Sequence, residues 1–221
     1  MNVSIFLPVL CRTEKDYIMT EACVKLMRAC TSVPFELVIV ETESNRCEHL
    51  ADVYLHQPTN PGIIPTHNIG FALCSGELVG MMSNDVYVTT NWLEALVECF
   101  ETRHDCGAAT LAACEIGHRK QDIIAEGIYF PCSVWRREHA RYDENIIDTW
   151  GDADMCTAMY LKGQKMYRNY KSIAHHLWNQ TIPQDDKYKA NWQRNFEYYK
   201  QKYAPYKDSW IYRVFVEGHV I

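Results

Sequence analysis

A short polar stretch, Ser83-Asn84-Asp85, separates two apolar runs near the middle of the chain. The run LVGMM ends at this stretch, and apolar residues resume at Val86. A turn at this place would usually include glycine or proline, and the stretch contains neither. A carboxylate beside an amide and a hydroxyl offers the oxygen ligands that hard divalent cations prefer. The stretch therefore indicates a site for a cation or a phosphate, and the alternative is a strand that ends in an Asx turn.

The elements that must position this stretch alternate between strand and helix patterns in the first half of the chain. Runs rich in branched apolar residues favour buried strands, and apolar residues at helical spacing behind a capping residue favour helices. Strands joined by helices form a parallel sheet with right-handed crossovers. We therefore predict an α/β fold with a mostly parallel central sheet flanked by helices. The predicted strands are 3–7 (ended by Pro8), 35–40, 52–55 and 77–82, and the predicted helices begin at Thr13, His67 and Thr90 or Asn91.

Polar residues follow three of the predicted strands, at the point where each strand ends. They occupy positions 8–12, 41–44 and 83–85. Ligands of open parallel sheets bind outside the carboxyl ends of the strands. We expect these three groups to lie together at one edge of the sheet and to line a ligand site.

The second half of the chain is less regular. Strands are predicted at 108–113 and 127–130, and a helix at 153–162 that ends before Gly163. Aromatic residues recur at helical spacing between 185 and 203, mixed with lysines and arginine. This mixture is compatible with an acceptor groove or a nucleic-acid groove. An amphipathic helix that packs its aromatic stripe on the core and exposes its lysines is the interpretation we favour.

Composition describes an ordinary globular chain. Its 221 residues suffice for one domain, or one domain with an appendage, and for a sizeable core. The contents of 48% hydrophobic and 23% charged residues are typical of globular proteins. A net charge of -6 argues against a general nucleic-acid coat, although it is compatible with a local basic groove.

Cysteine usage and the N-terminus bear on the compartment. Ten cysteines occur without any C-x-x-C spacing, which argues against a zinc ribbon or a thioredoxin-like motif. Most lie inside apolar periodic segments, so we interpret them as reduced core residues of a cytoplasmic protein. The N-terminus lacks the basic region of a signal peptide, and no apolar run reaches about 18 residues. We therefore expect no transmembrane segment.

Four segments together resemble a known family. In order along the chain they are VSIFLPVLCRTE, FELVIVETES, the block NPGIIPTHNIGFALCSGELVGMMSND, and WGDADMCTAMYLKG, followed by the histidines of IAHHLWNQT. This order resembles the inverting family 2 glycosyltransferases, which have the GT-A fold. The resemblance covers residues 1–180 as a single domain. It implies a Rossmann-like donor half at 1–100 and an acceptor and catalytic half at 101–180, so that 181–221 becomes a C-terminal helical extension packed on the core.

The resemblance also implies roles for individual residues. Asp85 would bind Mn²⁺ or Mg²⁺, with His176, favoured over His175, as a second ligand. Asp152 would be the general base, with Asp154 as the alternative. The remaining residues would bind the nucleotide sugar. Pro8, Leu10 and Arg12 would contact it after the first strand, and Glu41 would accept a hydrogen bond from the nucleotide base. His67 and Asn68 would bind the phosphates at a helix N-terminus, and Ser83 and Asn84 would hold the ribose or a water. The family more often has Asp at Glu41 and Arg at His67, and only Asp85 of its acidic triplet is a carboxylate here.

The predicted function is metal-assisted transfer of a sugar, with inversion, from a nucleotide-diphosphate sugar, most simply a UDP-sugar, to an acceptor hydroxyl. The acceptor stays open among a saccharide, a lipid carrier, a protein and a modified nucleobase. One alternative is a catalytically weak or inactive nucleotide-sugar-binding protein on the same fold. Another is a nucleotidyltransferase, which would normally carry a glycine-rich loop with a basic residue after the first strand. The segment LPVLCRTEK has no glycine there.

Overall fold

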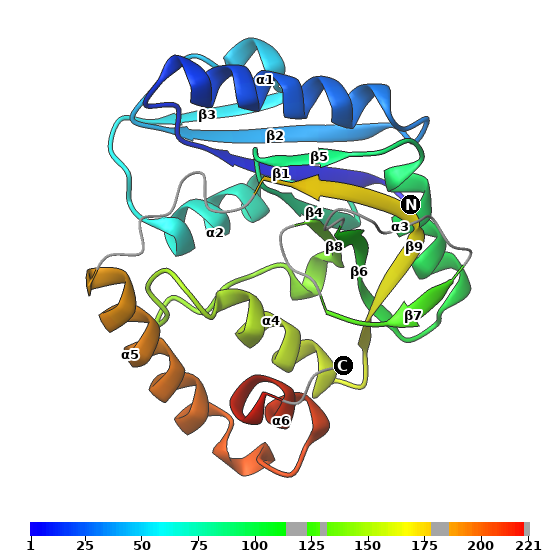
Figure 1. The fold of residues 1–221 in the computed structure, drawn as a ribbon, viewed down its shortest axis with the longest axis vertical. Helices are drawn as coiled ribbons and strands as arrows, with labels where there is room; N and C mark the ends of the chain where they lie inside the picture. Colours follow the sequence, from blue (N-terminus) through cyan, green and yellow to red (C-terminus); the bar gives the residue numbers. More distant parts are fainter. Residues whose placement is uncertain (114–122, 129–131, 178–185, 219–221) are drawn as a thin grey trace.

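The computed structural model describes residues 1–113, 123–128, 132–177 and 186–218, and Figure 1 shows them as one sheet with helices on both of its faces. Neighbouring residues of a strand point to opposite faces, so the sheet separates two apolar clusters. Ile5 packs in the cluster under α1 and α3, whereas Phe6 packs in the cluster under α2 and α4. The helices are α1 (Glu14–Ala29), α2 (Ile63–Leu73), α3 (Trp92–Thr102), α4 (Gly151–Tyr160), α5 (Asp186–Lys202) and α6 (Trp210–Glu217), with short 3-10 turns η1 (Glu48–Leu50), η2 (Arg137–His139) and η3 (Ala204–Tyr206).

Four parallel strands form the first half of the sheet, in the order β3-β2-β1-β4. The register pairs Val9 at the end of β1 with Glu41 near the end of β2. The carboxyl ends of these strands therefore meet at one edge, as the pattern of strands and helices predicts. The strands are β1 (Val3–Val9), β2 (Phe35–Thr42), β3 (Val53–Gln57) and β4 (Leu78–Met82).

The second half adds strands of mixed direction beyond β4. Strand β8 pairs antiparallel with β4 and with β6, and β6 runs parallel to β9. Short β5 and β7 pair with β9. The whole is a mixed, mostly parallel α/β sheet, and the predicted fold class is confirmed. These strands are β5 (Val86–Val88), β6 (Cys106–Ala113), β7 (Ile124–Glu126), β8 (Cys132–Arg136) and β9 (Lys165–His176).

Some predicted boundaries are wrong. Strand β1 continues through Pro8, whose missing N–H is tolerated because the pairing of β1 with β4 stops at Phe6. Helix α2 begins at Ile63, behind Gly62, so His67 lies inside the helix. The strand expected at 127–130 is instead β7, which ends at Glu126, and positions 129 and 130 lie outside the described residues. By contrast, Thr13 and Asp16 form the capping box that starts α1.

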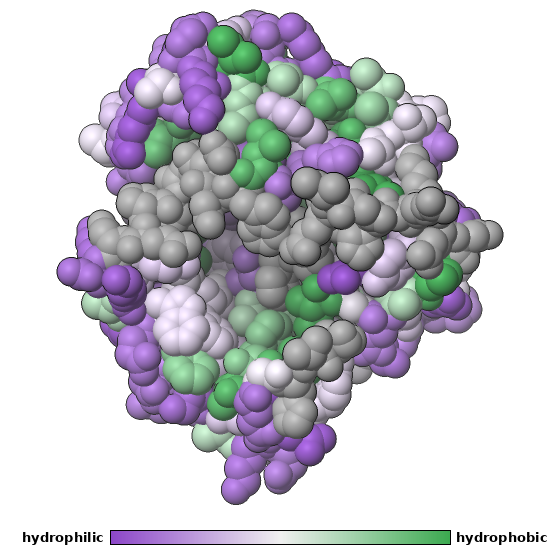
Figure 2. Space-filling model, viewed as in Figure 1, coloured by the Kyte–Doolittle hydropathy of each residue, from purple (hydrophilic) through white to green (hydrophobic). Residues whose placement is uncertain are grey.

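The C-terminal helices α5 and α6 pack against α4. Tyr199 and Tyr203 of this region form a small apolar cluster with Ala153 of α4, and the Tyr199 hydroxyl lies 2.6 Å from the hydroxyl of Thr157. Figure 2 shows hydrophilic residues along the outer edge over α5 and apolar residues gathered over α4. This is the arrangement of an amphipathic helix on a core. The division of the chain at position 180 stays a prediction.

Two expectations from composition also have structural counterparts. All nine described cysteines are free thiols, and all of them except Cys30 are buried. Within the described ranges, no helix is both long and apolar enough to cross a bilayer.

Candidate active site at the carboxyl ends of the strands

Asp85 and His176 face each other where β5 pairs with β9. The register places Val86 opposite His176, so the residue before β5 lies beside the last residue of β9. Nε2 of His176 lies 3.4 Å from Oδ2 of Asp85. The backbone N–H of Leu177 donates to the carbonyl of Asp85 at 2.9 Å, which closes this corner. His175 pairs with Tyr87 and is exposed, so the structure brings the predicted His176 to Asp85 instead.

The carboxylate of Asp85 is nearly inaccessible, with 3% of the residue exposed. Burial would raise its pKa, but hydrogen bonds from His176 and Ser83 outweigh burial and lower the pKa. The carboxylate is therefore anionic. Its Oδ1 is buried without a hydrogen-bond partner. A buried anionic oxygen without a partner costs free energy unless a cation satisfies it. Together with a neighbouring imidazole nitrogen, it is a donor set that fits Mn²⁺ or Mg²⁺.

Asp152 lies in the first turn of α4 and is held by a tyrosine. The hydroxyl of Tyr142 donates to Oδ1 of Asp152 and also lies 3.0 Å from Sδ of Met81 in β4. Tyr142 thereby links Asp152 to the strand that leads into Asp85. Burial raises the pKa of Asp152 to about 6, against the lowering effect of the Tyr142 hydrogen bond.

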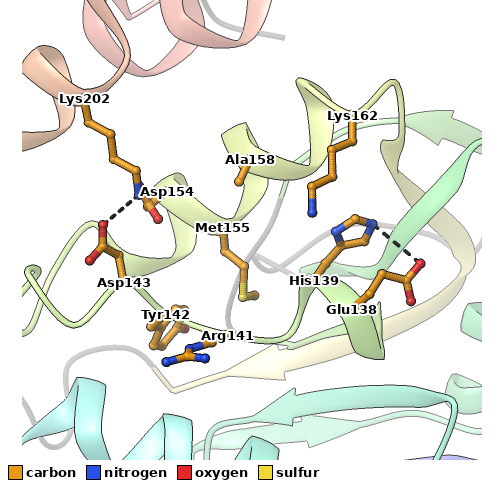
Figure 3. Close-up of a pocket in the computed structure, with 10 residues that line it drawn as sticks. All are labelled: Glu138, His139, Arg141, Tyr142, Asp143, Asp154, Met155, Ala158, Lys162 and Lys202. Carbon is orange, nitrogen blue, oxygen red and sulfur yellow. Dashed lines mark hydrogen bonds and ion pairs between the residues drawn. The ribbon is translucent and has the colours of Figure 1, made fainter.

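The alternative base, Asp154, is committed to an ion pair. Lys202 of α5 donates to Asp154 Oδ1 at 2.6 Å and to Asp143 Oδ2 at 2.8 Å. Figure 3 shows these groups at one end of a cavity of about 260 Å³, with His139 and Lys162 at the other end. Asp154 is 4% exposed, so its carboxylate is buried against its cationic partner. Asp154 is thus engaged by a cation, and the choice of Asp152 as the base stays a prediction.

The geometry can be compared with known proteins at this point. The model of the family "Glycosyl transferase family 2" matches residues 9–170. The chain belongs to this family. The resemblance expected from the sequence is therefore confirmed, and family membership favours glycosyl transfer over nucleotidyl transfer.

Named relatives and solved structures agree with this assignment. A glucosyl-dolichyl phosphate glucuronosyltransferase of Haloferax volcanii is 30% identical over 139 residues, which are 58% of this chain and 44% of the relative. The family 2 chain thus spans less than half the length of this curated relative. A crystal structure of GalNAc-T7 with UDP, GalNAc and Mn²⁺ superposes with a TM-score of 0.66 at 12% identity, covering 82% of this chain and 44% of that one. The crystal structure of Staphylococcus aureus TarS 1–349 in complex with UDP-GlcNAc superposes with a TM-score of 0.58 at 16% identity. The match covers 81% of this chain and 60% of the TarS chain. Both likenesses support the GT-A fold.

Glu41 of this glycosyltransferase chain does not have the predicted surroundings. It is fully buried, and its carboxylate accepts hydrogen bonds from the hydroxyls of Ser44 at 2.5 Å and Tyr54 at 2.9 Å. The backbone N–H groups of Arg46 and Cys47 donate to it at 2.9 and 2.8 Å. These hydrogen bonds lower its pKa against the opposing effect of burial. The carboxylate thereby fixes the loop after β2, and the expected hydrogen bond from Glu41 to a nucleotide base stays a prediction.

His67 and Asn68 are also placed differently from the prediction. Nδ1–H of His67 donates to the Ile63 carbonyl at 2.7 Å, and burial lowers the pKa of His67 to about 4, so the ring is neutral. The ring therefore carries no charge at neutral pH, and contact of His67 with a phosphate stays a prediction. The side chain of Asn68 makes two hydrogen bonds to the backbone of Tyr142, at 2.8 and 3.0 Å. The two residues position Tyr142 instead, with His67 packing its ring 5.2 Å from that of Tyr142.

Ser83 and Asn84 likewise support Asp85 from within the protein. Ser83 hydrogen-bonds the Asp85 carboxylate. Asn84 is 5% exposed, and its amide donates to Oγ1 of Thr20 in α1 at 2.9 Å. The side chain of Asn84 thus joins the turn after β4 to α1, and its expected contact with a ribose or a water stays a prediction.

The predicted donor residues at the end of β1 and just after it lie beside the loop that Glu41 fixes. Pro8 and Leu10 are half-buried, and the exposed Arg12 pairs with Glu43 at 3.2 Å. The backbone N–H of Cys11 donates to Oγ of Ser44 at 3.2 Å, which joins the two loops. Contact of Pro8, Leu10 and Arg12 with a nucleotide stays a prediction.

Sequence reasoning missed Tyr142 and Lys202, which control the two carboxylates of α4. Tyr142 lies in a segment without strand or helix periodicity, so no pattern distinguished it. Lys202 was visible only as one lysine among several on α5. Both assignments depend on contacts between residues distant in the sequence.

Proposed function

We propose that this family 2 protein transfers a sugar, with inversion, from a UDP-sugar to an acceptor hydroxyl, assisted by a divalent cation. The observation that carries the proposal is the unpartnered, buried Oδ1 of Asp85 beside the imidazole of His176 at the carboxyl end of the sheet. Similar structures solved with UDP, and in one case with Mn²⁺, support a UDP-linked donor.

Asp85 and His176 would hold the cation, Mn²⁺ or Mg²⁺. When bound, such a cation supplies positive charge that stabilises a departing diphosphate. Ser83 keeps the carboxylate anionic and oriented through its hydrogen bond. Asn84, through Thr20, fixes the backbone that carries both residues. The protein thereby prepares an anionic site before any ligand arrives, which lowers the cost of reorganisation during the reaction.

Asp152 would take the proton of the attacking hydroxyl. Its Oδ1 accepts the Tyr142 hydrogen bond, and Oδ2 remains to accept from the acceptor. A pKa of about 6 leaves the carboxylate ionised at neutral pH, yet it is a stronger base than an ordinary aspartate. A base in this range typically contributes roughly 10²- to 10⁴-fold to the rate.

The loops after β1 and β2 would receive the nucleotide. They are connected by the hydrogen bond from Cys11 to Ser44, and the β2 loop is fixed on Glu41. Leu10 and Arg12 are the predicted contacts on the β1 side. Fixing both loops before binding reduces the entropy lost when the nucleotide is bound.

A thermal-shift screen tests the proposal directly. Purified protein is heated with UDP, GDP, ADP and CDP, and with UDP-linked glucose, N-acetylglucosamine, galactose and glucuronic acid, each with Mn²⁺ or with EDTA. A ligand that binds only the native state raises the melting temperature by mass action. We expect the uridine nucleotides to raise it in Mn²⁺ and to lose most of that effect in EDTA. Stabilisation by none of them, or by another nucleotide alone, would contradict the proposal.

A further inference from the structure

Two buried cysteines lie in sulfur–sulfur contact beneath the proposed donor loops. Sγ of Cys11, directly after β1, is 3.9 Å from Sγ of Cys47, in the loop after β2, and the two are 36 positions apart. Cys11 is 5% exposed and Cys47 is fully buried. In the part of the chain that the structure describes, no other cysteine pair makes such a contact.

The surroundings make the two thiols unequal. Oγ1 of Thr20 lies 3.7 Å from Sγ of Cys11. Hydrogen bonds from Cys47 and Thr20 lower the pKa of Cys11, against burial and the charge of Glu41. The same contact with Cys11, together with burial, raises the pKa of Cys47. Cys11 therefore loses its proton before Cys47 does, and it is the more nucleophilic sulfur of the two, because the thiolate is the reactive form.

Glu41 completes a group of three possible metal ligands with the two sulfurs, all within 4.8 Å of one another. Its carboxylate, however, already accepts from Ser44, Tyr54 and two backbone N–H groups. A soft metal would have to displace several of these hydrogen bonds inside a closed environment. A bond between the two sulfurs removes their mutual contact and the contacts of the thiols with Thr20 and Glu41, and it leaves the four other hydrogen bonds to the Glu41 carboxylate in place. The geometry therefore favours a disulfide over a metal.

We infer that Cys11 and Cys47 are a redox modification site, where a reversible disulfide joins the loops after β1 and β2 and weakens nucleotide binding. The effect on binding rests on the proposed function. With hydrogen peroxide as oxidant, the Cys11 thiolate attacks one peroxide oxygen, the O–O bond breaks, and hydroxide leaves with a proton as water. The Cys47 sulfur then attacks the Cys11 sulfenic acid, and a second water leaves as the S–S bond forms. The thiol pair loses two electrons, and the peroxide gains them.

The disulfide would change the loops because its bond is short. An S–S bond of about 2.05 Å requires the sulfurs to approach by roughly 1.9 Å. Cys11 lies between Leu10 and Arg12, the predicted nucleotide contacts, and its N–H holds Ser44. Pulling Cys11 towards Cys47 therefore displaces both donor loops from the arrangement fixed by Glu41.

The test begins with wild-type protein, which avoids any folding defect of a variant. Native protein is treated with a small excess of hydrogen peroxide, and its intact mass, its cross-linked peptides and its affinity for UDP in Mn²⁺ are measured. We expect a loss of about 2 Da, a peptide that joins Cys11 to Cys47, and a UDP affinity at least fivefold lower that dithiothreitol restores. Cys11→Ser and Cys47→Ser should abolish the cross-link, whereas Cys74→Ala, which removes a buried thiol elsewhere, should leave it intact.

Four results would overturn the inference. They are the absence of the Cys11–Cys47 peptide, the same cross-link yield in Cys11→Ser, stoichiometric zinc in the purified protein, and a disulfide that leaves UDP affinity unchanged. Peptide mapping does not depend on ligand binding. If the reduced protein fails to bind UDP at all, the proposed function fails on that result, and the cross-link still decides whether the modification site exists.

Discussion

The hydroxyl of Tyr142 donates a hydrogen bond to Oδ1 of Asp152 and touches Sδ of Met81, so one side chain joins the proposed base to the strand that leads to Asp85. His67 and Asn68 of α2 hold Tyr142 in this position. Helix α2, strand β4 and the loop of Tyr142 are thus connected to one carboxylate of α4 by contacts between residues at least ten positions apart. This convergence supports Asp152 as the group that removes the acceptor proton.

Replacement of Asp152 by Asn should remove catalysis without removing the donor. The amide has nearly the shape of the carboxylate but cannot accept a proton, so turnover should fall roughly 10²- to 10⁴-fold. UDP affinity, measured by calorimetry, should change less than threefold. Asp186→Asn, at a fully exposed carboxylate, is the control and should keep wild-type turnover. Near-normal turnover of Asp152→Asn would reject the role.

The same variant should be more stable at neutral pH. The folded-state pKa of Asp152, about 6, lies above its ordinary value, so the folded protein binds this proton more tightly than the unfolded chain. The free energy of unfolding therefore falls as the pH rises from the ordinary pKa of an aspartate, 3.8, to about 6, and the ionised carboxylate lowers the stability at pH 7. We expect Asp152→Asn to add roughly 1–3 kcal/mol at pH 7 and little at pH 3.5. Urea denaturation at the two pH values measures the difference, and equal gains at both would contradict this origin.

Activity should follow the protonation of Asp152. Below about pH 6 the carboxyl is protonated and cannot act as a base, so kcat/KM should fall tenfold per pH unit on the acid side. Tyr142→Phe removes the hydrogen bond that lowers this pKa, so the acid limb should move to higher pH. Tyr198→Phe removes a hydroxyl bonded to Asp143 and should leave the limb in place. A limb that stays fixed in Tyr142→Phe would show that another group titrates.

Lys202 should stabilise the fold through Asp154. Lys202→Met leaves a buried carboxylate without its cationic partner, which we expect to cost about 1–3 kcal/mol. Lys200→Met removes a cation from the exposed pair with Glu197 and should cost at most about 0.5 kcal/mol. Chemical denaturation of both variants at pH 7 gives the comparison. Equal losses would mean that the Asp154 pair carries no special stability.

Local patterns predicted the donor half of the fold well and the site less completely. Alternating strands and helices fixed the parallel order around β1, and the polar stretches at the strand ends led to Asp85 and, through the family resemblance, to His176. The roles of Glu41, His67 and Asn84 towards a nucleotide stay predictions, and the structure gives each of these side chains a partner that the sequence did not indicate. Each was inferred from its position at a strand or helix end, whereas its side chain makes hydrogen bonds within the protein. These bonds are local for Glu41 and His67, and that of Asn84 reaches Thr20, 64 positions away. Such partners, like Tyr142 for Asp152, become visible only once the chain is folded.

The claim on which the account depends most is that Asp85 and His176 bind a divalent cation needed by the donor. Calorimetric titration of UDP into wild-type protein, with Mn²⁺ and with EDTA, and into Asp85→Asn with Mn²⁺, tests it most directly. Asp105→Asn, at a half-exposed carboxylate away from the site, serves as control. We predict that EDTA and Asp85→Asn each weaken UDP binding by tenfold or more, and that Asp105→Asn does not. Equal UDP affinity in wild type and folded Asp85→Asn, both in Mn²⁺, would contradict the account.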